Sequence, residues 1–165
     1  MTLLVVLSAL LLDAEPAPLN EKVVAFARSK LGQRVGDGDC SSFAREALRY
    51  AGAKPTGTGR SWGEVVPSLR DAKPGDILQF ENAVFVRRLE RDDGALLTLT
   101  FRYPHHTAIV SRVRRRGRSV VLTVLHQNAG TEGGDEDERK VVQEWTVNMA
   151  EMKSGTVKAY RPVAG

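Results

Sequence analysis

The first third of the chain, after an apolar leader, has the spacing of two amphipathic helices. Asn20 can cap the first helix, and apolar residues then recur three and four positions apart, as they do on one buried helix face. Asp39 can cap the second helix, which is expected over residues 40–51 and ends at Gly52. A third, short helix is expected over residues 61–69. The N-terminal part of the chain is therefore predicted to be helical.

The pattern changes after a Pro-Gly turn at residues 73–76, where apolar and polar residues begin to alternate as in strands. Strands are predicted over residues 77–80, 84–89, 96–101, 107–113, 119–125, 141–147 and 156–161. Residues 92–94 and 116–117 are typical of hairpin tips. Helices followed by a run of strands predict an α+β domain, with N-terminal helices packed on an antiparallel β-sheet.

The leader itself, residues 3–12, is almost entirely apolar and is too short to cross a membrane as an ordinary helix. It fits the apolar region of a secretory signal, with a cleavage point at Ala14 or Ala17, although no Lys or Arg precedes it. The alternative is a buried first helix. We predict a signal peptide over residues 1–18, one domain over residues 19–165, a secreted or periplasmic location, and no integral membrane segment.

Composition narrows the chemistry further. A single cysteine excludes an intramolecular disulfide framework and a multi-cysteine zinc site, and the net charge of +4 does not indicate nucleic acid. The acidic stretch 131–138 lacks the alternating ligands of a calcium loop, so a solvated loop is expected there. Five arginines cluster around residues 116–117, either as a solvated tip or as a surface that attracts anionic polymers or membranes.

The single cysteine, Cys40, falls at the expected start of the second helix. Free backbone N–H groups and the helix dipole favour a thiolate there, although a lone cysteine is also a common small core residue. His106 opens one predicted strand and His126 ends the next, and pairing of these strands would bring both to one level. Only one of His105 and His106 can face the sulfur, and we favour His106 because it directly precedes the apolar strand.

Several motifs resemble those of NlpC-type cell-wall peptidases. Asp-Cys-Ser-Ser-Phe at residues 39–43 resembles their Asp-Cys-Ser-Gly-Phe signature, and Pro-Gly-Asp-Ile-Leu-Gln-Phe at residues 74–80 resembles a characteristic strand. His-Thr-Ala-Ile-Val at residues 106–110 resembles their histidine strand. His-Gln-Asn at residues 126–128 takes the place of the Glu-x-Asn element of the related CHAP amidohydrolases. The resemblance covers residues 20–162 and implies a papain-like fold of the NlpC/CHAP type.

The resemblance also implies roles for the catalytic residues. Cys40 would be the nucleophile and His106 the base. His126 would orient the imidazole of His106, as a third-position histidine does in NlpC-type enzymes. Asn128 matches the CHAP asparagine and is the alternative for that third position.

Supporting residues are less well defined. Asp39 and Ser41 flank Cys40 and are expected to support the oxyanion site. Ser42 stands where the family has glycine, which would narrow a substrate groove. Trp62 is a candidate for lining that groove, with core packing as the alternative. The stretch 80–106 is longer than in a minimal family member, and an additional hairpin is expected there.

These observations predict a cysteine-nucleophile amidohydrolase or peptidase that cleaves amide bonds in peptidoglycan peptides through a thioester intermediate. The mechanism requires no metal and no organic cofactor. Two alternatives remain open: a non-catalytic module of the same fold that binds cell-wall peptides or glycans, and a secreted effector or toxin with the same chemistry.

Overall fold

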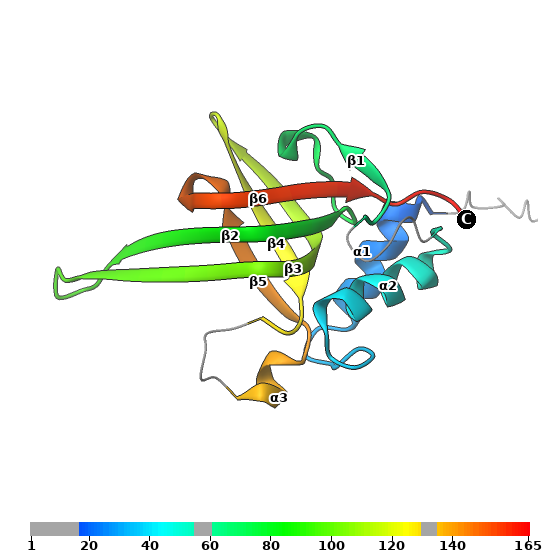
Figure 1. The fold of residues 1–165 in the computed structure, drawn as a ribbon, viewed down its shortest axis with the longest axis horizontal. Helices are drawn as coiled ribbons and strands as arrows, with labels where there is room; N and C mark the ends of the chain where they lie inside the picture. Colours follow the sequence, from blue (N-terminus) through cyan, green and yellow to red (C-terminus); the bar gives the residue numbers. More distant parts are fainter. Residues whose placement is uncertain (1–16, 55–60, 130–134) are drawn as a thin grey trace, which may run out of the picture.

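The computed structural model describes residues 17–54, 61–129 and 135–165 (Figure 1). These residues form an α+β domain in which a twisted six-stranded antiparallel sheet, in the order β1-β6-β2-β3-β4-β5, packs on two helices. The helices are α1 (Leu19–Ser29), α2 (Cys40–Ala51) and the short α3 (Glu136–Arg139), with 3₁₀ turns η1 (Leu69–Asp71) and η2 (Met149–Glu151). The strands are β1 (Glu64–Val66), β2 (Ile77–Glu90), β3 (Leu96–Arg116), β4 (Ser119–His126), β5 (Gln143–Asn148) and β6 (Met152–Arg161). The predicted α+β class with an antiparallel sheet is confirmed.

The second helix has the predicted limits because both ends carry the expected signals. Asp39 occupies the position before the first turn in extended conformation, although its side chain makes no capping hydrogen bond, and Gly52 ends the helix in the left-handed region with φ 77°. Phe43, Ala47 and Leu48 lie on the buried face between them. The predicted spacing of polar and apolar residues therefore fixed both the limits of α2 and the face that it packs on the sheet.

Two apolar clusters lie on the two faces of the sheet. On one face, the helices pack on a cluster that includes Phe43, Ile77 and Ile109. On the other face, Phe80 and Leu122 belong to a second cluster formed mainly by the strands. Burial on both faces of the sheet explains why residues 77–80 of β2 and residues 106–111 of β3 are unbroken buried runs rather than a strict alternation.

Strands β2 and β3 continue past the rest of the sheet as a long two-stranded ribbon, the arm at the left of Figure 1. Pairing of β2 with β6 ends at Phe85, and pairing of β3 with β4 begins at Ile109, whereas β2 and β3 pair with each other out to Glu90 and Leu96. The additional hairpin expected between residues 80 and 106 is thus present, as an extension of two core strands.

Asn82 is the position in β2 at which the regular alternation of side chains between the two faces of the ribbon is interrupted. Its φ is +49°, and the register between β2 and β6 shifts here. As a result, Phe80 and Phe85 lie in the same apolar cluster although five positions separate them. Gly155 of β6 makes this close approach possible, because a Cβ at that position would lie 2.2 Å from the carbonyl oxygen of Asn82.

Asp76, which lies directly before β2, connects this strand to α1 and to β6. Its side chain is fully buried and accepts hydrogen bonds from Asn20 Nδ2 at 2.7 Å, from the Lys73 N–H at 2.8 Å and from the Arg161 guanidinium at 3.0 Å. A buried carboxylate needs such partners, because an unpaired charge in the interior is strongly destabilising. The Pro-Gly-Asp turn therefore fixes α1 and β6 relative to β2.

Some predicted elements were wrong. Residues 61–69 form no helix, because Glu64–Val66 pairs with β6 as β1, and the turn η1 follows only at Leu69. Asn20 does not cap α1, which begins at Leu19, since its side chain bonds to Asp76 and Pro74 instead. The four strands predicted between residues 77 and 113 are two long ones. All of the leader, residues 3–12, and part of the acidic stretch 131–138 lie outside the described residues.

Candidate functional site

Cys40 is the first residue of α2 and lies against the middle of β3. Its side chain is buried, with 9% of the residue exposed. The backbone and side chain of Thr107 act to lower the pKa of the thiol, which places the sulfur beside the residue that follows His106. Among the described residues, no hydrogen bond joins the sulfur to an imidazole. The helix start therefore places the thiol next to the histidine strand without pairing it with a base.

His106 and His126 form a buried pair. The His106 Nε2 atom lies 2.9 Å from the His126 Nδ1 atom, and the two rings meet at 78° with their centroids 5.1 Å apart. His106 comes from β3 and His126 from the last position of β4, which pairs with β3 in antiparallel register. The register ends with Ile109 opposite Leu125, so His126 falls at the level of Ala108, two positions from His106. The two side chains still meet, but as diagonal neighbours rather than as the directly opposite pair that the spacing about the turn at residues 116–117 predicted.

The charge state of the three groups follows from burial. Burial lowers the pKa of His106 to about 3, and the neighbouring His126 lowers it further while Asp39 acts in the opposite direction. Burial also lowers the pKa of His126 to about 4. Burial raises the pKa of the Cys40 thiol above its ordinary 9.0, and the Thr107 N–H only partly opposes this effect. At neutral pH the resting site thus holds a neutral thiol and two neutral imidazoles.

Asp39 and its partners form a second polar group beside the thiol. The Asp39 carboxylate accepts hydrogen bonds from Ser41 Oγ at 2.8 Å and from Asn128 Nδ2 at 3.0 Å. Burial acts to raise the pKa of Asp39, but these two hydrogen bonds and the backbone N–H of Cys40 together outweigh it, so the pKa lies below its ordinary value. Asn128 therefore bonds to the residue before the nucleophile position, whereas His126 is the residue that contacts His106.

Gln127 is a positioning residue that the sequence did not single out. Its amide donates hydrogen bonds to the carbonyls of Val35 and Asp39, both at 2.8 Å, and accepts one from the Val35 N–H at 3.1 Å. The side chain is fully buried. The end of β4 thus holds the loop that leads into Cys40. The only sequence signal was the position of Gln127 between His126 and Asn128.

The two residues expected to line a groove have other surroundings. Ser42 donates its hydroxyl to Asp37 and to the Asp39 carbonyl, so it closes the loop before α2. Trp62 is buried in the apolar cluster under the helices, and its Nε1–H donates to Gln79 Oε1 at 3.0 Å. Trp62 is therefore a core residue, which was the alternative to lining a groove.

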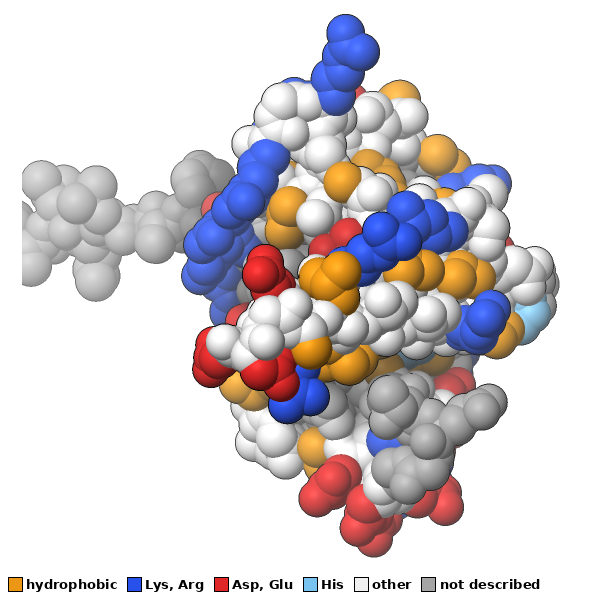
Figure 2. All heavy atoms as spheres, turned by 90° about the vertical axis from the view of Figure 1, so that its left-hand side faces the viewer, with side chains coloured by type: hydrophobic (Ala, Val, Ile, Leu, Met, Phe, Trp, Pro, Cys, Tyr) orange, Lys and Arg blue, Asp and Glu red, His pale blue; other side chains and the backbone are white. Residues whose placement is uncertain are grey.

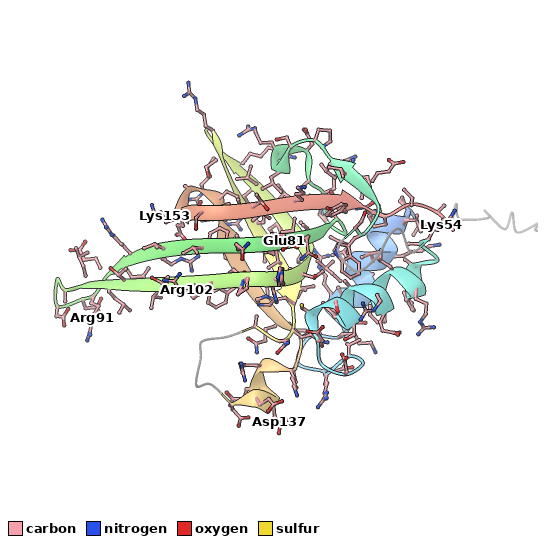
Figure 3. All side chains as sticks on the ribbon, viewed as in Figure 1. Lys54, Glu81, Arg91, Arg102, Asp137 and Lys153 are labelled. Carbon is pink, nitrogen blue, oxygen red and sulfur yellow. The ribbon has the colours of Figure 1, made fainter. Side chains whose placement is uncertain are left out.

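His105 points away from the buried pair. Its Nδ1 lies 2.6 Å from Glu81 Oε2, and its side chain is 55% exposed. Glu81 is labelled in Figure 3 near the base of the arm, with Arg102 further out on β3 and Arg91 at the tip. The alternation of the strand thus separates the two neighbouring histidines, as expected, and leaves His106 as the buried one.

A row of aromatic rings leads from the histidine pair onto the arm. Tyr103 stacks on His106 with ring centroids 5.2 Å apart, and Trp145 lies 6.5 Å from His126. Phe101 meets Trp145 edge-on at 5.1 Å, and the Arg87 guanidinium lies over both rings. The cavity between these side chains is about 10 Å³, which is room for a single water. A larger ligand would therefore lie along this surface.

Metal-binding clusters and membrane-spanning helices bear on the predicted partners. Within the residues that the structure describes, no group of three or more His, Cys, Asp or Glu side chains could hold a metal ion. In the same residues, no helix combines the length and the apolar character needed to cross a membrane.

Comparison with known proteins decides the family. The family model of the AIM3/BBC1 cysteine proteinase-fold domain matches residues 7–165. The chain belongs to this family. Its fold is thereby a cysteine proteinase fold, which is papain-like, in agreement with the coarser part of the predicted resemblance.

A curated relative places the AIM3/BBC1 domain in a longer protein. The chain is 24% identical over 162 residues to "Altered inheritance of mitochondria protein 3" of the yeast Debaryomyces hansenii. The match covers 87% of this chain but only 16% of the relative, so the chain spans about a sixth of that protein. No solved structure matches the chain.

These matches correct the predicted function. A peptidoglycan amidohydrolase, a cell-wall binding module and a secreted effector are wrong, because the family is AIM3/BBC1 and the relative is a yeast protein named for the inheritance of mitochondria. The NlpC/CHAP assignment was correct only as far as the papain-like fold. The short motifs around Cys40 and His106 are shared by the fold, and they do not identify a substrate.

The predicted location is corrected by the same finding. A signal peptide and a secreted or periplasmic location are wrong for a domain whose relative is this yeast protein. The family model begins at residue 7, within the stretch assigned to the signal. The domain boundary at residue 18 and the roles assigned to Cys40, His106, His126 and Asn128 stay predictions.

Proposed function

We propose that this domain is a non-catalytic polypeptide-binding domain, which binds an apolar segment of a partner protein on one face of the β2–β3 arm. The observation that carries the proposal is a continuous row of apolar side chains on that face. It runs from His106 through Tyr103 and Phe101 to Leu99 and Leu97, and it passes from buried to exposed positions along the way.

The tip of the arm shows why this face fits a ligand. Leu89 and Leu97 are cross-strand partners, and each is 42% exposed. A two-stranded ribbon gains little stability in water by itself, and unpaired strand edges are normally protected. The edge of an exposed ribbon can accept an added strand from a partner, and the apolar face then contacts alternate side chains of that strand. Figure 2 views the arm from its tip, with hydrophobic side chains between Lys and Arg.

The state of the Cys40 site supports the non-catalytic part of the proposal. A thiol that is buried and neutral, beside imidazoles that are also neutral, is not the thiolate–imidazolium pair that attacks an amide. The same polar groups have a structural use, because they join α2, β3 and β4 through Thr107, His106 and His126.

A cysteine peptidase that acts on a cellular polypeptide is the second candidate. The contact between His106 and His126 favours it, because a third residue that holds the far nitrogen of the base is the arrangement of a catalytic triad. The two candidate functions differ in what they require of the Cys40 thiol. Catalysis requires a thiolate at neutral pH, and binding on the arm does not require Cys40.

Alkylation by iodoacetamide against pH tests the thiol. For a non-catalytic site we expect the rate to rise only above the ordinary thiol pKa of 9.0, and we expect no cleavage of casein or of a quenched peptide library. An alkylation midpoint below neutral pH, together with cleavage that is lost in Cys40→Ala, would overturn the non-catalytic proposal.

Peptide selection tests the arm. Peptides selected from a random display library on the wild-type chain should bind Cys40→Ala equally well and should lose binding to Leu97→Asp. Thr98→Asp is the matched control, because Thr98 is exposed on the opposite face of the same strand. Selected peptides that bind all three variants alike, or that require Cys40, would contradict binding on the arm.

A further inference from the structure

A second surface, remote from the arm face, is formed by the β3–β4 hairpin, whose tip rises at the top of Figure 1. Its members are arginines, all of them exposed: Arg112, Arg114, Arg115, Arg116 and Arg118, with Arg70 of the neighbouring turn η1. We call these residues the arginine hairpin. Among the described residues, the salt bridges include none of these six side chains.

The arginine hairpin is held in place by hydrogen bonds to backbone carbonyls. Arg115 Nε donates to the Arg70 carbonyl at 2.8 Å, and Arg70 donates to the Gly117 carbonyl at 2.7 Å. Val113 packs on the apolar cluster below. The hairpin is therefore fixed against η1, and its charges project from a rigid base.

This concentration of charge is unfavourable in the isolated domain. Like charges on neighbouring residues repel one another, and Arg114, Arg115 and Arg116 are consecutive. A solvated hairpin tip requires only polar residues, and it does not require arginine at each of these positions. Guanidinium groups, in contrast, bind carboxylates through two parallel hydrogen bonds.

We propose that the arginine hairpin binds an acidic, extended segment of a partner protein, whose carboxylates alternate along the segment. Arg112, Arg114 and Arg116 are at alternate positions of β3, so they share one face with a repeat of about 7 Å. Side chains at alternate positions of an extended peptide have the same repeat. Pairing of β2 with β3 reaches only Ile109, and the turn before β2 bonds to the backbone of Val110, so β2 does not pair with the part of β3 that carries these arginines.

An anionic membrane fits this surface less well. Proteins that bind at a membrane interface place large apolar side chains next to their basic residues. The large hydrophobic residues that are exposed in the described parts of the chain are Leu31, Tyr50, Val65, Leu89, Leu96 and Leu97. None of them lies in the part of the hairpin where β3 pairs with β4, residues 109–125, so the chemistry of the surface favours carboxylates of a protein.

Fluorescence anisotropy with a labelled peptide in which Glu alternates with Thr tests the proposal. We expect the triple variant R112Q/R114Q/R116Q to bind this peptide about tenfold more weakly than the wild type. The matched control is R88Q/R91Q/R102Q, which removes the same charge from exposed positions of the arm and should bind as the wild type does. Thermal unfolding of both variants checks that the fold is kept.

Four results would overturn the proposal. Equal weakening in both triple variants would show an effect of net charge alone. Equal binding of a peptide of the same composition with its Glu residues grouped together would exclude the alternating register. Binding of phosphatidylserine vesicles without binding of the peptide, or self-association that the R112Q/R114Q/R116Q variant abolishes, would assign the surface to a membrane or to a second copy of the chain.

Discussion

The Nε2 atom of His106 lies 2.9 Å from the Nδ1 atom of His126, and neither residue is more than 5% exposed. One nitrogen donates and the other accepts, so each ring satisfies a polar atom that would otherwise be buried without a partner. The contact links β3 to the last residue of β4. The same contact would orient a base in an enzyme, and it joins two strands in a binding domain.

Removing one member of this pair should therefore destabilise the domain. In His126→Ala the Nε2 atom of His106 remains buried but loses its partner, which typically costs about 1–3 kcal/mol in the free energy of unfolding. Urea denaturation measures the change. His105→Ala is the control, because His105 is exposed and its ion pair with Glu81 is worth at most about 1 kcal/mol. Equal losses in the two variants would show that the buried contact is not important for stability.

The two buried imidazoles also predict a loss of stability in acid. In the unfolded chain each histidine titrates near its ordinary pKa of 6.5, whereas burial lowers the pKa of His106 to about 3 and that of His126 to about 4. Below pH 6.5 the unfolded chain binds more protons than the folded domain. The free energy of unfolding is therefore greatest above 6.5 and falls as the pH drops towards 4 and 3.

Urea denaturation as a function of pH measures this loss. The double variant His106→Phe/His126→Leu removes both groups and should have a flatter profile between about pH 4 and 7. If the wild type and the double variant lose stability in parallel, other groups cause the acid sensitivity.

The sequence was sufficient to predict the elements whose signals are local. Helix α2 has a cap position, a buried face and a terminating glycine within one short stretch, and its limits were predicted correctly. The proximity of His106 and His126 followed from counting residues on each side of a turn, although the register shift in β3 sets them two positions apart. The separate faces of His105 and His106 followed from the alternation of a strand.

Features that depend on distant partners could not be predicted. Asn20 looks like a helix cap, but its amide bonds to Asp76, which lies 56 positions further along the chain. Gln127 is a buried polar residue whose partners, Val35 and Asp39, lie about ninety positions earlier. The prediction of the substrate class was wrong for a related reason. Local motifs describe the fold around a thiol, and they contain no contact with a substrate.

Asp39 should control the reactivity of the thiol. Its charge and its contact with the sulfur both act to raise the pKa of Cys40, after the larger effect of burial. Asp39→Asn should therefore lower the pKa of the Cys40 thiol and increase the rate of alkylation by iodoacetamide severalfold at mildly alkaline pH. The rate is measured by mass spectrometry of the modified chain.

Asp37→Asn is the matched control for Asp39→Asn. Asp37 is an acidic residue of the same loop, but it bonds to Ser42 and to the Asp39 N–H and makes no contact with the sulfur. We expect its alkylation rate to stay close to that of the wild type. Equal acceleration in both variants would point to loosening of the loop rather than to the charge of Asp39.

The absence of a side chain at Gly155 allows β6 to approach the backbone of Asn82 closely. A Cβ at Gly155 would lie 2.2 Å from the carbonyl oxygen of Asn82, and the backbone φ is 82°. Gly94, at the tip of the arm, has a similar φ of 78° but open space around its missing Cβ. Gly94→Ala should cost only the backbone strain, about 1–2 kcal/mol.

Gly155→Ala adds a steric clash to that strain, and we expect it to lower the free energy of unfolding by about 1–3 kcal/mol more than Gly94→Ala. The comparison cancels the backbone contribution because both glycines occupy the left-handed region. Urea denaturation of the two variants gives the difference. If Gly155→Ala lowers the free energy of unfolding no more than Gly94→Ala does, the contact with β6 does not stabilise the bulge at Asn82. The face that joins Tyr103 to Leu97 would then be set by the arm alone.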